Sequence, residues 1–147
     1  MNVTSLGKRK VRWLMEQQVA PIIALQEHHL RKSDYFRVVK QLKRRYRVFG
    51  HPAVPKNEGT TGGVMVLVEN WCQASPVWNT ESQTKMWAAA MIAMRGITMM
   101  VVSLYLPPGE TATNLQTIHE VFNTSGRTTS PYVIAGDYNL HRTKCSG

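Results

Sequence analysis

The sequence predicts a layered α/β sandwich, because segments typical of strands and of helices alternate along it. Two observations support this fold class. Runs that are apolar on both faces, such as residues 22–25 and 63–68, are typical of strands covered on both sides. Apolar residues three and four positions apart in 8–18 and 111–122 are typical of helices with one buried face. The 147 residues, 43% of them hydrophobic, are enough for one domain with a real core.

The first 62 residues predict three strands and two helices. Residues 2–5 read as the tail of a strand, and a helix follows over 8–18 with one apolar stripe. A short strand over 22–25 precedes a helix that begins at Ser33 and Asp34 and continues to Leu42. Residues 46–49 alternate like a strand. Residues 50–62 predict a polar loop, because prolines and glycines interrupt them.

The remaining residues are mostly β. Strands are expected over 63–68, 86–94 and 97–106, with a tight turn at Arg95 and Gly96. A helix over 111–122 and a strand over 132–135 complete the order β-α-β-α-β-β-β-β-α-β.

The net charge of +9 is confined to the first third of the chain. Residues 1–50 hold 12 Lys/Arg and 3 Asp/Glu, whereas residues 51–147 hold 6 of each. A one-sided basic field favours a polyanionic partner, most often nucleic acid, although a solvated face is the simpler alternative. The candidate contacts are Lys8, Arg9, Lys10, Lys43, Arg44 and Arg45.

Cysteine content and hydropathy indicate an intracellular chain without a membrane segment. Cys72 and Cys145 lie far apart without zinc-type spacing, so we expect unpaired thiols. No apolar run is long enough to span a bilayer, and residues 1–12 lack the apolar region of a secretory signal.

Polar residues follow three of the predicted strands. Glu27 comes directly after residues 22–25, Tyr105 lies near the end of 97–106, and Asp137 and Asn139 follow 132–135. Strand ends can present polar side chains in a cleft, and such carboxylate and amide oxygens suit Mg²⁺ acting on phosphate. Each residue also has a plain structural explanation: a surface glutamate, a packed tyrosine, an Asx turn.

Taken in order, Asn2-Val3, Gln26-Glu27, Gly62-Gly63, Tyr105 and Gly136-Asp137-Tyr138-Asn139 resemble the endonuclease/exonuclease/phosphatase superfamily. The resemblance is greatest to endonuclease domains of non-LTR retrotransposons and to abasic-site endonucleases. It implies that Glu27 and Asn2 bind Mg²⁺, with Mn²⁺ as an alternative, and that Tyr105 contacts the scissile phosphate. It further implies that Asp137 and Asn139 position the attacking water and the phosphate.

The sequence also departs from that family. A Ser-Asp-His motif, which the family carries in its C-terminal half, is absent, and none of the five histidines occupies such a motif. Residues 1–147 are therefore expected to form a partial, truncated domain. Uncovered sheet surface would then favour self-association.

The function expected from this resemblance is Mg²⁺-dependent hydrolysis of nucleic acid, DNA rather than RNA, with weak or no activity. Two alternatives remain open: a non-catalytic nucleic-acid-binding remnant, and a phosphatase acting on a small phosphate ester. A retroelement origin would imply a nuclear location.

Overall fold

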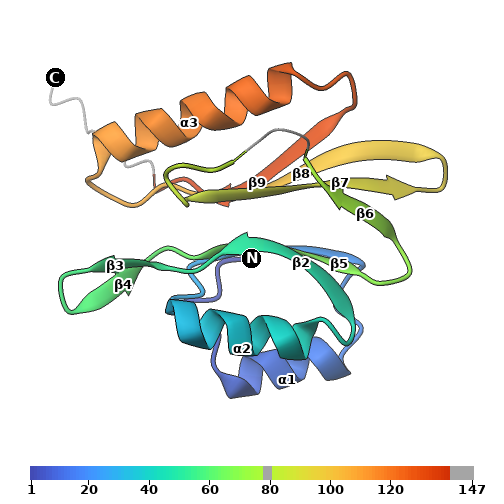
Figure 1. Cartoon of the computed structure of the whole chain (residues 1–147), viewed down its shortest axis with the longest axis horizontal. Helices are drawn as coiled ribbons and strands as arrows, with labels where there is room; N and C mark the ends of the chain where they lie inside the picture. The colour runs from blue at the N-terminus through green and yellow to red at the C-terminus, as the bar shows by residue number, and fades with distance from the viewer. Residues whose placement is uncertain (78–80, 140–147) are drawn as a thin grey trace, which may run out of the picture.

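Two β-sheets lie face to face, and helices cover the outer side of each (Figure 1). The computed structural model describes residues 1–77 and 81–139. The first layer holds α1 (Lys8–Glu16) and α2 (Lys32–Leu42) over a sheet of β1 (Ile22–Gln26), β5 (Val64–Glu69) and β2 (Tyr46–His51), in that order. The second sheet has the order β6 (Gln73–Pro76), β7 (Trp87–Met94), β8 (Ile97–Tyr105) and β9 (Tyr132–Asp137), under α3 (Thr111–Gly126). The predicted layered α/β sandwich is confirmed.

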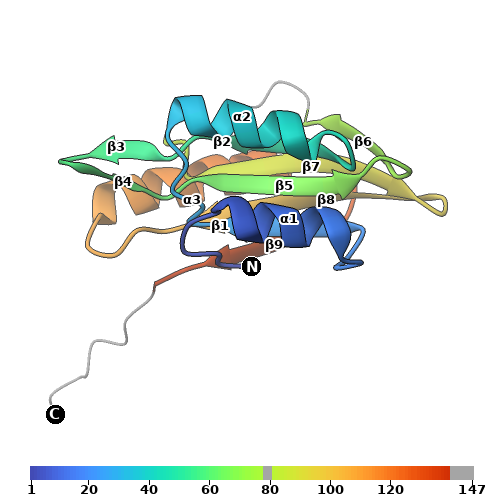
Figure 2. The same cartoon turned by 90° about the horizontal axis from the view of Figure 1, so that it is seen from below.

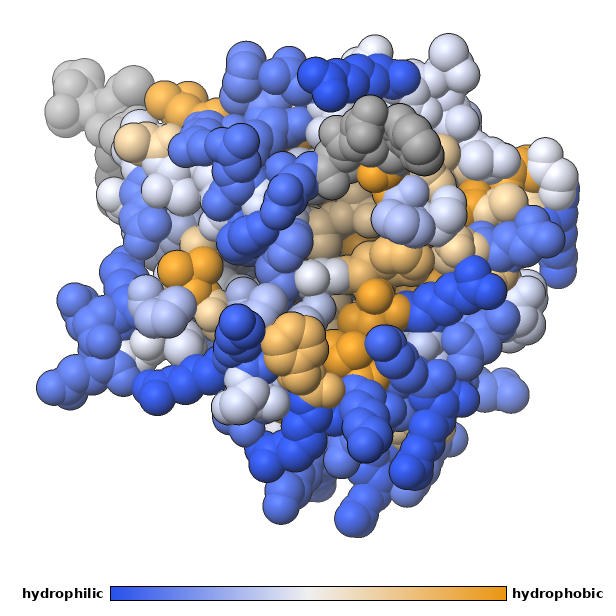
Figure 3. Space-filling model, in the orientation of Figure 1, coloured by the Kyte–Doolittle hydropathy of each residue, from blue (hydrophilic) through white to orange (hydrophobic). Residues whose placement is uncertain are grey.

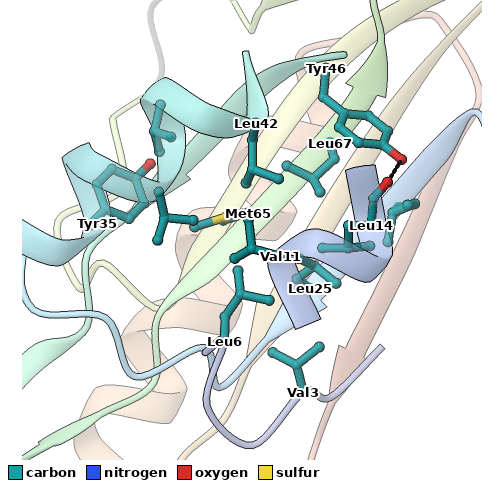
Figure 4. Close-up of a cluster of buried hydrophobic side chains, with 13 residues drawn as sticks. Val3, Leu6, Val11, Leu14, Leu25, Tyr35, Leu42, Tyr46, Met65 and Leu67 are labelled. Carbon is teal, nitrogen blue, oxygen red and sulfur yellow. Dashed lines mark hydrogen bonds between the residues drawn. The ribbon is translucent and has the colours of Figure 1, made fainter. Parts of the chain in front are cut away.

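The core of the first layer lies between the helices and the sheet (Figure 4). Strand β5 runs antiparallel to both of its neighbours, and its residues Val64–Val68 are fully buried. Leu14 of α1 and Leu42 of α2 pack against this sheet, as their helical spacing predicts. The Tyr46 hydroxyl donates to the Leu14 carbonyl at 2.9 Å, which fixes α1 to the start of β2.

The second layer is built around a long hairpin. Strands β7 and β8 pair from Trp87–Leu104 to Met94–Ile97, and Arg95 and Gly96 form the predicted turn with φ values of 51° and 76°. Both residues of such a two-residue hairpin turn need positive φ, which glycine adopts without strain. Strand β9 runs parallel to β8, and α3 is the crossover between them. The parallel pairing brings the C-terminal ends of β8 and β9 to one edge.

The structure corrects the sequence-based prediction at several places. Residues 50–62 are not simply a loop, because β3 (Val54–Lys56) and β4 (Gly59–Thr61) form a hairpin (Figure 2). This hairpin pairs with no third strand among the described residues, so Pro55 breaks no further ladder. Strand β6 was missed, α3 extends to Gly126, and the predicted first strand is a single parallel bridge between Asn2 and Gln26.

The structure describes only one of the two cysteines and tests the membrane expectation only for the described residues. Cys72 is a free, buried thiol, whereas Cys145 and His141 lie outside the described residues. Within the described ranges, no helix is both long and apolar enough to cross a bilayer.

Candidate active site

Three strand ends from the two sheets meet at one edge of the sandwich. Tyr105 is the last residue of β8 and pairs in register with Asp137, the last residue of β9. Glu27 follows β1, which belongs to the other sheet, and its φ of 58° turns the chain sharply there. Glu27 therefore reaches Tyr105 and Asp137 across the sandwich and not along one sheet.

Asn2 joins the two carboxylates. Its side-chain nitrogen Nδ2 donates to Glu27 Oε2 and, at 2.6 Å, to Asp137 Oδ2. Its oxygen Oδ1 accepts from the Thr4 backbone N–H at 3.0 Å and from the Thr4 hydroxyl at 3.1 Å. One amide thus bridges residues 110 positions apart, and Thr4 fixes the orientation of that amide.

Tyr105 is buried beneath this carboxylate pair. Only 4% of its surface is exposed, and its hydroxyl bonds to Glu27 and to Thr61 of β4. Burial, first of all, and then the bond to the Glu27 carboxylate raise the pKa of Tyr105 well above its ordinary value. The hydroxyl therefore remains protonated and can donate a hydrogen bond at any physiological pH.

Asn139 is held by its neighbours. Its Nδ2 donates to the Leu106 carbonyl at 3.1 Å, and its backbone N–H donates to Asp137 Oδ1 at 3.3 Å. The Leu106 N–H in turn donates to the Asp137 carbonyl at 2.9 Å. Asp137 and Asn139 are therefore in the same site, although the second bond is the Asx-type contact that a simple turn would also make.

A buried polar pair supports the site from below. Gln26 Nε2 donates to Ser103 Oγ at 2.9 Å, and Ser103 Oγ donates to the Leu25 carbonyl at 2.8 Å. Both side chains are at most 2% exposed, so these bonds tie β1 to β8 without competition from water. Sequence reasoning missed Ser103, although a lone serine inside the apolar run 97–106 was a usable signal.

The histidines near the site bond elsewhere. His28 is fully buried, and its Nδ1 accepts from the Leu30 N–H at 3.0 Å. The other ring nitrogen, Nε2, then carries the proton and donates to the His51 carbonyl at 3.0 Å. His29 Nδ1 contacts the Thr60 hydroxyl at 3.3 Å. These contacts give His28 and His29 structural roles.

The donor set suits a small divalent cation. Two carboxylates converge on one N–H donor, and a hard cation between them would relieve their mutual repulsion. Mg²⁺ is commonly bound by one or two carboxylates, with water and substrate phosphate completing the shell. Within residues 1–77 and 81–139, no cluster of three or more His, Cys, Asp or Glu side chains forms a closed metal cage. The carboxylates of Glu27 and Asp137 therefore fit an open site for a small divalent cation. Of the two predicted Mg²⁺ ligands, Glu27 supplies one of these carboxylates, whereas the Asn2 oxygen accepts from Thr4.

The predicted basic contacts fall into two separate groups. Lys8, Arg9 and Lys10 begin α1, and Lys10 Nζ donates to the Val3 carbonyl and, at 3.0 Å, to the Ser5 carbonyl, next to Asn2. Lys43 and Arg44 follow the last residue of α2, at the other end of that 11-residue helix. With a rise of 1.5 Å per residue, the two ends of α2 lie roughly 16 Å apart. Hydrophilic side chains cover the lower part of the face in Figure 3, over α1 and α2.

Arg45 has an internal role. Its guanidinium pairs with the Glu69 carboxylate at 2.7 Å and donates to the Leu14, Met15 and Gln17 carbonyls at the end of α1. The guanidinium N–H groups that could bind a nucleic-acid phosphate are therefore already engaged inside the protein. The interpretation of the basic surface below therefore rests on the other five residues.

Comparison with known structures identifies the fold. Similar structures include a humanized TDP2 of D. rerio (15% identity, TM-score 0.59, 97% of this chain and 61% of that one). The endonuclease domain of TRAS1, a telomere-specific non-LTR retrotransposon, matches with 16% identity, a TM-score of 0.59, and 97% and 58% coverage. An AP endonuclease from Archaeoglobus fulgidus matches with 19% identity, a TM-score of 0.55, and 88% and 51% coverage.

These structural neighbours are members of the endonuclease/exonuclease/phosphatase superfamily, and the chain has their fold. It spans between half and two thirds of the length of each of these three. No protein-family model and no curated protein sequence matches the chain.

Proposed function

We propose that this chain carries a site for metal-dependent phosphodiester hydrolysis in nucleic acid, and that its turnover is weak. The observation that carries the proposal is the bridge from the Asn2 amide to the carboxylates of Glu27 and Asp137. Two carboxylates are held together where three strands end, and a bound cation would balance their charge. Folds of this kind host nucleases among the similar structures, which supports the same reaction class here.

Each side chain then has a role set by its position. Bound Mg²⁺, or Mn²⁺, would polarise the phosphate and stabilise the leaving oxygen. Glu27 would hold the cation, with Asp137 as the facing carboxylate, and Asp137 together with Asn139 would orient the attacking water. The protonated Tyr105 hydroxyl would donate to a phosphate oxygen. Asn2 would set the spacing of the carboxylates through its side chain.

The start of α1 supports an anionic substrate. Lys8, Arg9 and Lys10 occupy the first turn of this helix, where the helix dipole favours negative charge and where α1 has no acidic residue. Three cations at this position do not help the helix. Lys10 Nζ uses two of its three N–H donors on the Val3 and Ser5 carbonyls, so we attribute phosphate binding near the site mainly to Lys8 and Arg9. We propose DNA as the substrate, in line with the expectation from the sequence.

Weak turnover is expected because no histidine within residues 1–77 and 81–139 is placed to act as a general acid. His28 and His29 bond to Leu30, His51 and Thr60, and neither is positioned to protonate a leaving oxygen at Asp137. General acid–base groups contribute typically ~10²–10⁴-fold to such reactions. We therefore expect slow cleavage, carried by the metal and by positioning alone.

The test is nicking of supercoiled plasmid by the full chain with Mg²⁺. We expect slow nicking that EDTA abolishes and that Glu27→Gln and Asp137→Asn each reduce by at least about tenfold. Glu58→Gln removes an exposed carboxylate of the β3–β4 turn and is the matched control. Nicking that persists in EDTA, or that falls equally in all three variants, would contradict the proposal.

A non-catalytic nucleic-acid-binding role is the second candidate. Lys43 and Arg44 favour it, because they follow the last residue of α2 and, within the described residues, form no hydrogen bond or ion pair with the carboxylates of the site. Such binding would depend strongly on salt, require no metal and survive Asp137→Ala. Binding with these properties, together with no nicking in the plasmid assay, would favour this role over catalysis.

A further inference from the structure

A groove of about 1080 Å³ lies between the start of α2 and the segment that joins β2 to β3. Apolar residues form part of its lining, among them Ala53, Val54 and Pro55. Phe36 of α2 lines it as well and is 57% exposed, although phenylalanine is one of the residues most often buried. An exposed aromatic ring in a groove offers a flat apolar surface to a ligand.

The groove carries excess positive charge. Arg31, Lys32 and Lys85 line it, and within the described residues no Asp or Glu does. Asp34, on the first turn of α2, is paired with Arg37. The carboxylate of Glu81 lies 3.6 Å from Lys85 Nζ and is largely exposed, so it neutralises that cation only in part. The groove therefore suits an anion that also has an apolar face.

The β3–β4 hairpin connects this groove to the candidate site. Val54 and Gly59 of the hairpin line the groove, while Thr61 of the same hairpin bonds to the Tyr105 hydroxyl. The hairpin projects beside the start of α2 in both views (Figures 1 and 2). A strand that leaves the site across this hairpin would enter the groove directly.

We propose that this groove binds an unpaired stretch of the nucleic-acid strand whose phosphodiester lies in the candidate site. One base would stack on Phe36, and Arg31, Lys32 and Lys85 would contact the phosphates. Stacking on an exposed aromatic ring requires a base with a free face, which bases inside a duplex do not offer. The inference rests on the proposed function and adds a preference for single-stranded character beside the cleavage position.

The first test measures stacking. Binding of a labelled single-stranded DNA oligonucleotide to the full chain is followed by fluorescence anisotropy. Base–aromatic stacking contributes about 1–3 kcal/mol per base, so Phe36→Ala should weaken binding by roughly 5- to 150-fold. Phe122→Ala removes an equally exposed phenylalanine from α3 and should leave the affinity unchanged. Equal affinities of these two variants would overturn the proposal.

The second test measures charge on the same helix. Lys32→Gln should reduce the slope of log affinity against log salt by roughly 0.7, the value for one phosphate contact on a single strand. Lys40→Gln, an equal neutralisation in the last turn of α2, should change the slope much less. Heparin, which has no bases, should respond to Lys32→Gln but not to Phe36→Ala. A heparin affinity that falls with both variants would overturn the stacking assignment.

Binding of a duplex with the same sequence tests whether double-stranded nucleic acid occupies the groove instead. Duplex binding that is as tight as single-strand binding and equally sensitive to Phe36→Ala would overturn the preference for an unpaired strand. Measuring oligonucleotide binding in EDTA separates this inference from the proposed function, because EDTA should abolish nicking while the groove residues can still bind the strand. If Phe36→Ala weakens binding but no nicking depends on Glu27, the groove proposal is supported and catalysis is contradicted. If nicking depends on Glu27 but Phe36→Ala leaves binding unchanged, catalysis is supported and the groove proposal is contradicted.

Discussion

At the scale of single residues, Asn2 and Thr4 show how the two carboxylates are held together. The Asn2 amide supplies N–H groups to two carboxylates, and Thr4 satisfies the amide oxygen. A hydrogen-bond donor thus occupies the place between Glu27 and Asp137 where a cation would balance their charge.

The buried His28 makes stability depend on pH. Burial is the main cause that lowers its pKa to about 4, from an ordinary value near 6.5. Between pH 4 and 6.5 the unfolded chain therefore binds a proton that the folded chain does not, so stability falls as the pH drops. This group alone should cost about 3 kcal/mol of unfolding free energy between pH 7 and pH 4.

Urea unfolding at several pH values, with NMR titration of the histidine rings, checks this prediction. His119→Gln removes an exposed histidine of α3 and should leave the pH dependence unchanged. An NMR resonance of His28 that titrates near pH 6.5 would show that the ring is not held neutral as described.

At the scale of elements, the Gln26–Ser103 pair joins the two sheets. Ser103→Ala removes a hydroxyl that accepts from Gln26 and donates to Leu25, and it leaves the buried amide of Gln26 with only its 3.4 Å contact to the Ala135 carbonyl. An unsatisfied buried polar group costs about 1–3 kcal/mol, so we expect that loss in chemical denaturation. We also expect weaker nicking, because Glu27 directly follows β1.

Ser125→Ala is the matched control for that substitution. Ser125 is also buried, but its hydroxyl only donates to the Val121 carbonyl of its own helix, so its removal should cost little. Equal loss of unfolding free energy in the two variants would contradict the prediction that the Ser103 hydroxyl stabilises the contact between the two sheets.

Elements also show where sequence reasoning succeeded and failed. The long strands β7 and β8 and their turn were predictable, because Arg95-Gly96 is a local signal inside a continuous apolar pattern. The β3–β4 hairpin was not, because Pro55, Gly59 and polar residues mark its strands as a loop, and its pairing is too short for a periodic pattern. Thr61 contributes to the site only through that hairpin, so its contact with Tyr105 could not be read from the sequence.

The site itself was predictable as a set of residues but not as a geometry. Glu27, Tyr105 and Asp137 each lie at or near the end of an apolar run, and they could be selected together because the order of their motifs resembles that of the endonuclease/exonuclease/phosphatase superfamily. Their meeting across two sheets depends on the parallel pairing of β8 and β9 and on the bridge between Asn2 and Gln26. No local pattern encodes either of these long-range contacts. The internal use of Arg45 was equally hidden, since its partners come from α1 and β5.

At the scale of the whole molecule, the second sheet ends in an open edge. Strand β9 pairs only with β8 among the described residues, and Tyr132 and Val133 on it are 47% and 51% exposed. Leu115 and Phe122 are exposed on the neighbouring α3. An unpaired apolar strand edge is a template for pairing with another chain. We therefore expect the described chain to self-associate as its concentration rises.

Light scattering coupled to size-exclusion chromatography over a concentration series checks this prediction. Val133→Lys should shift the population toward monomer, because lysine protects edge strands. Ile97→Lys places the same charge at an exposed apolar position of the β7–β8 hairpin tip and should have a smaller effect. A monomer at every concentration, or equal effects of both variants, would contradict association through β9.

The separation of Glu27 and Asp137 along the chain has a consequence for biosynthesis. These carboxylates are 110 residues apart, and the strand that carries Asp137 is the last element described. A ribosome-bound chain that has produced only the first layer holds Glu27 without its facing carboxylate. The cleft can form only after β9 has emerged and paired with β8. Any cleavage activity is thereby withheld from incomplete chains, and its appearance during synthesis would report the docking of the final strand.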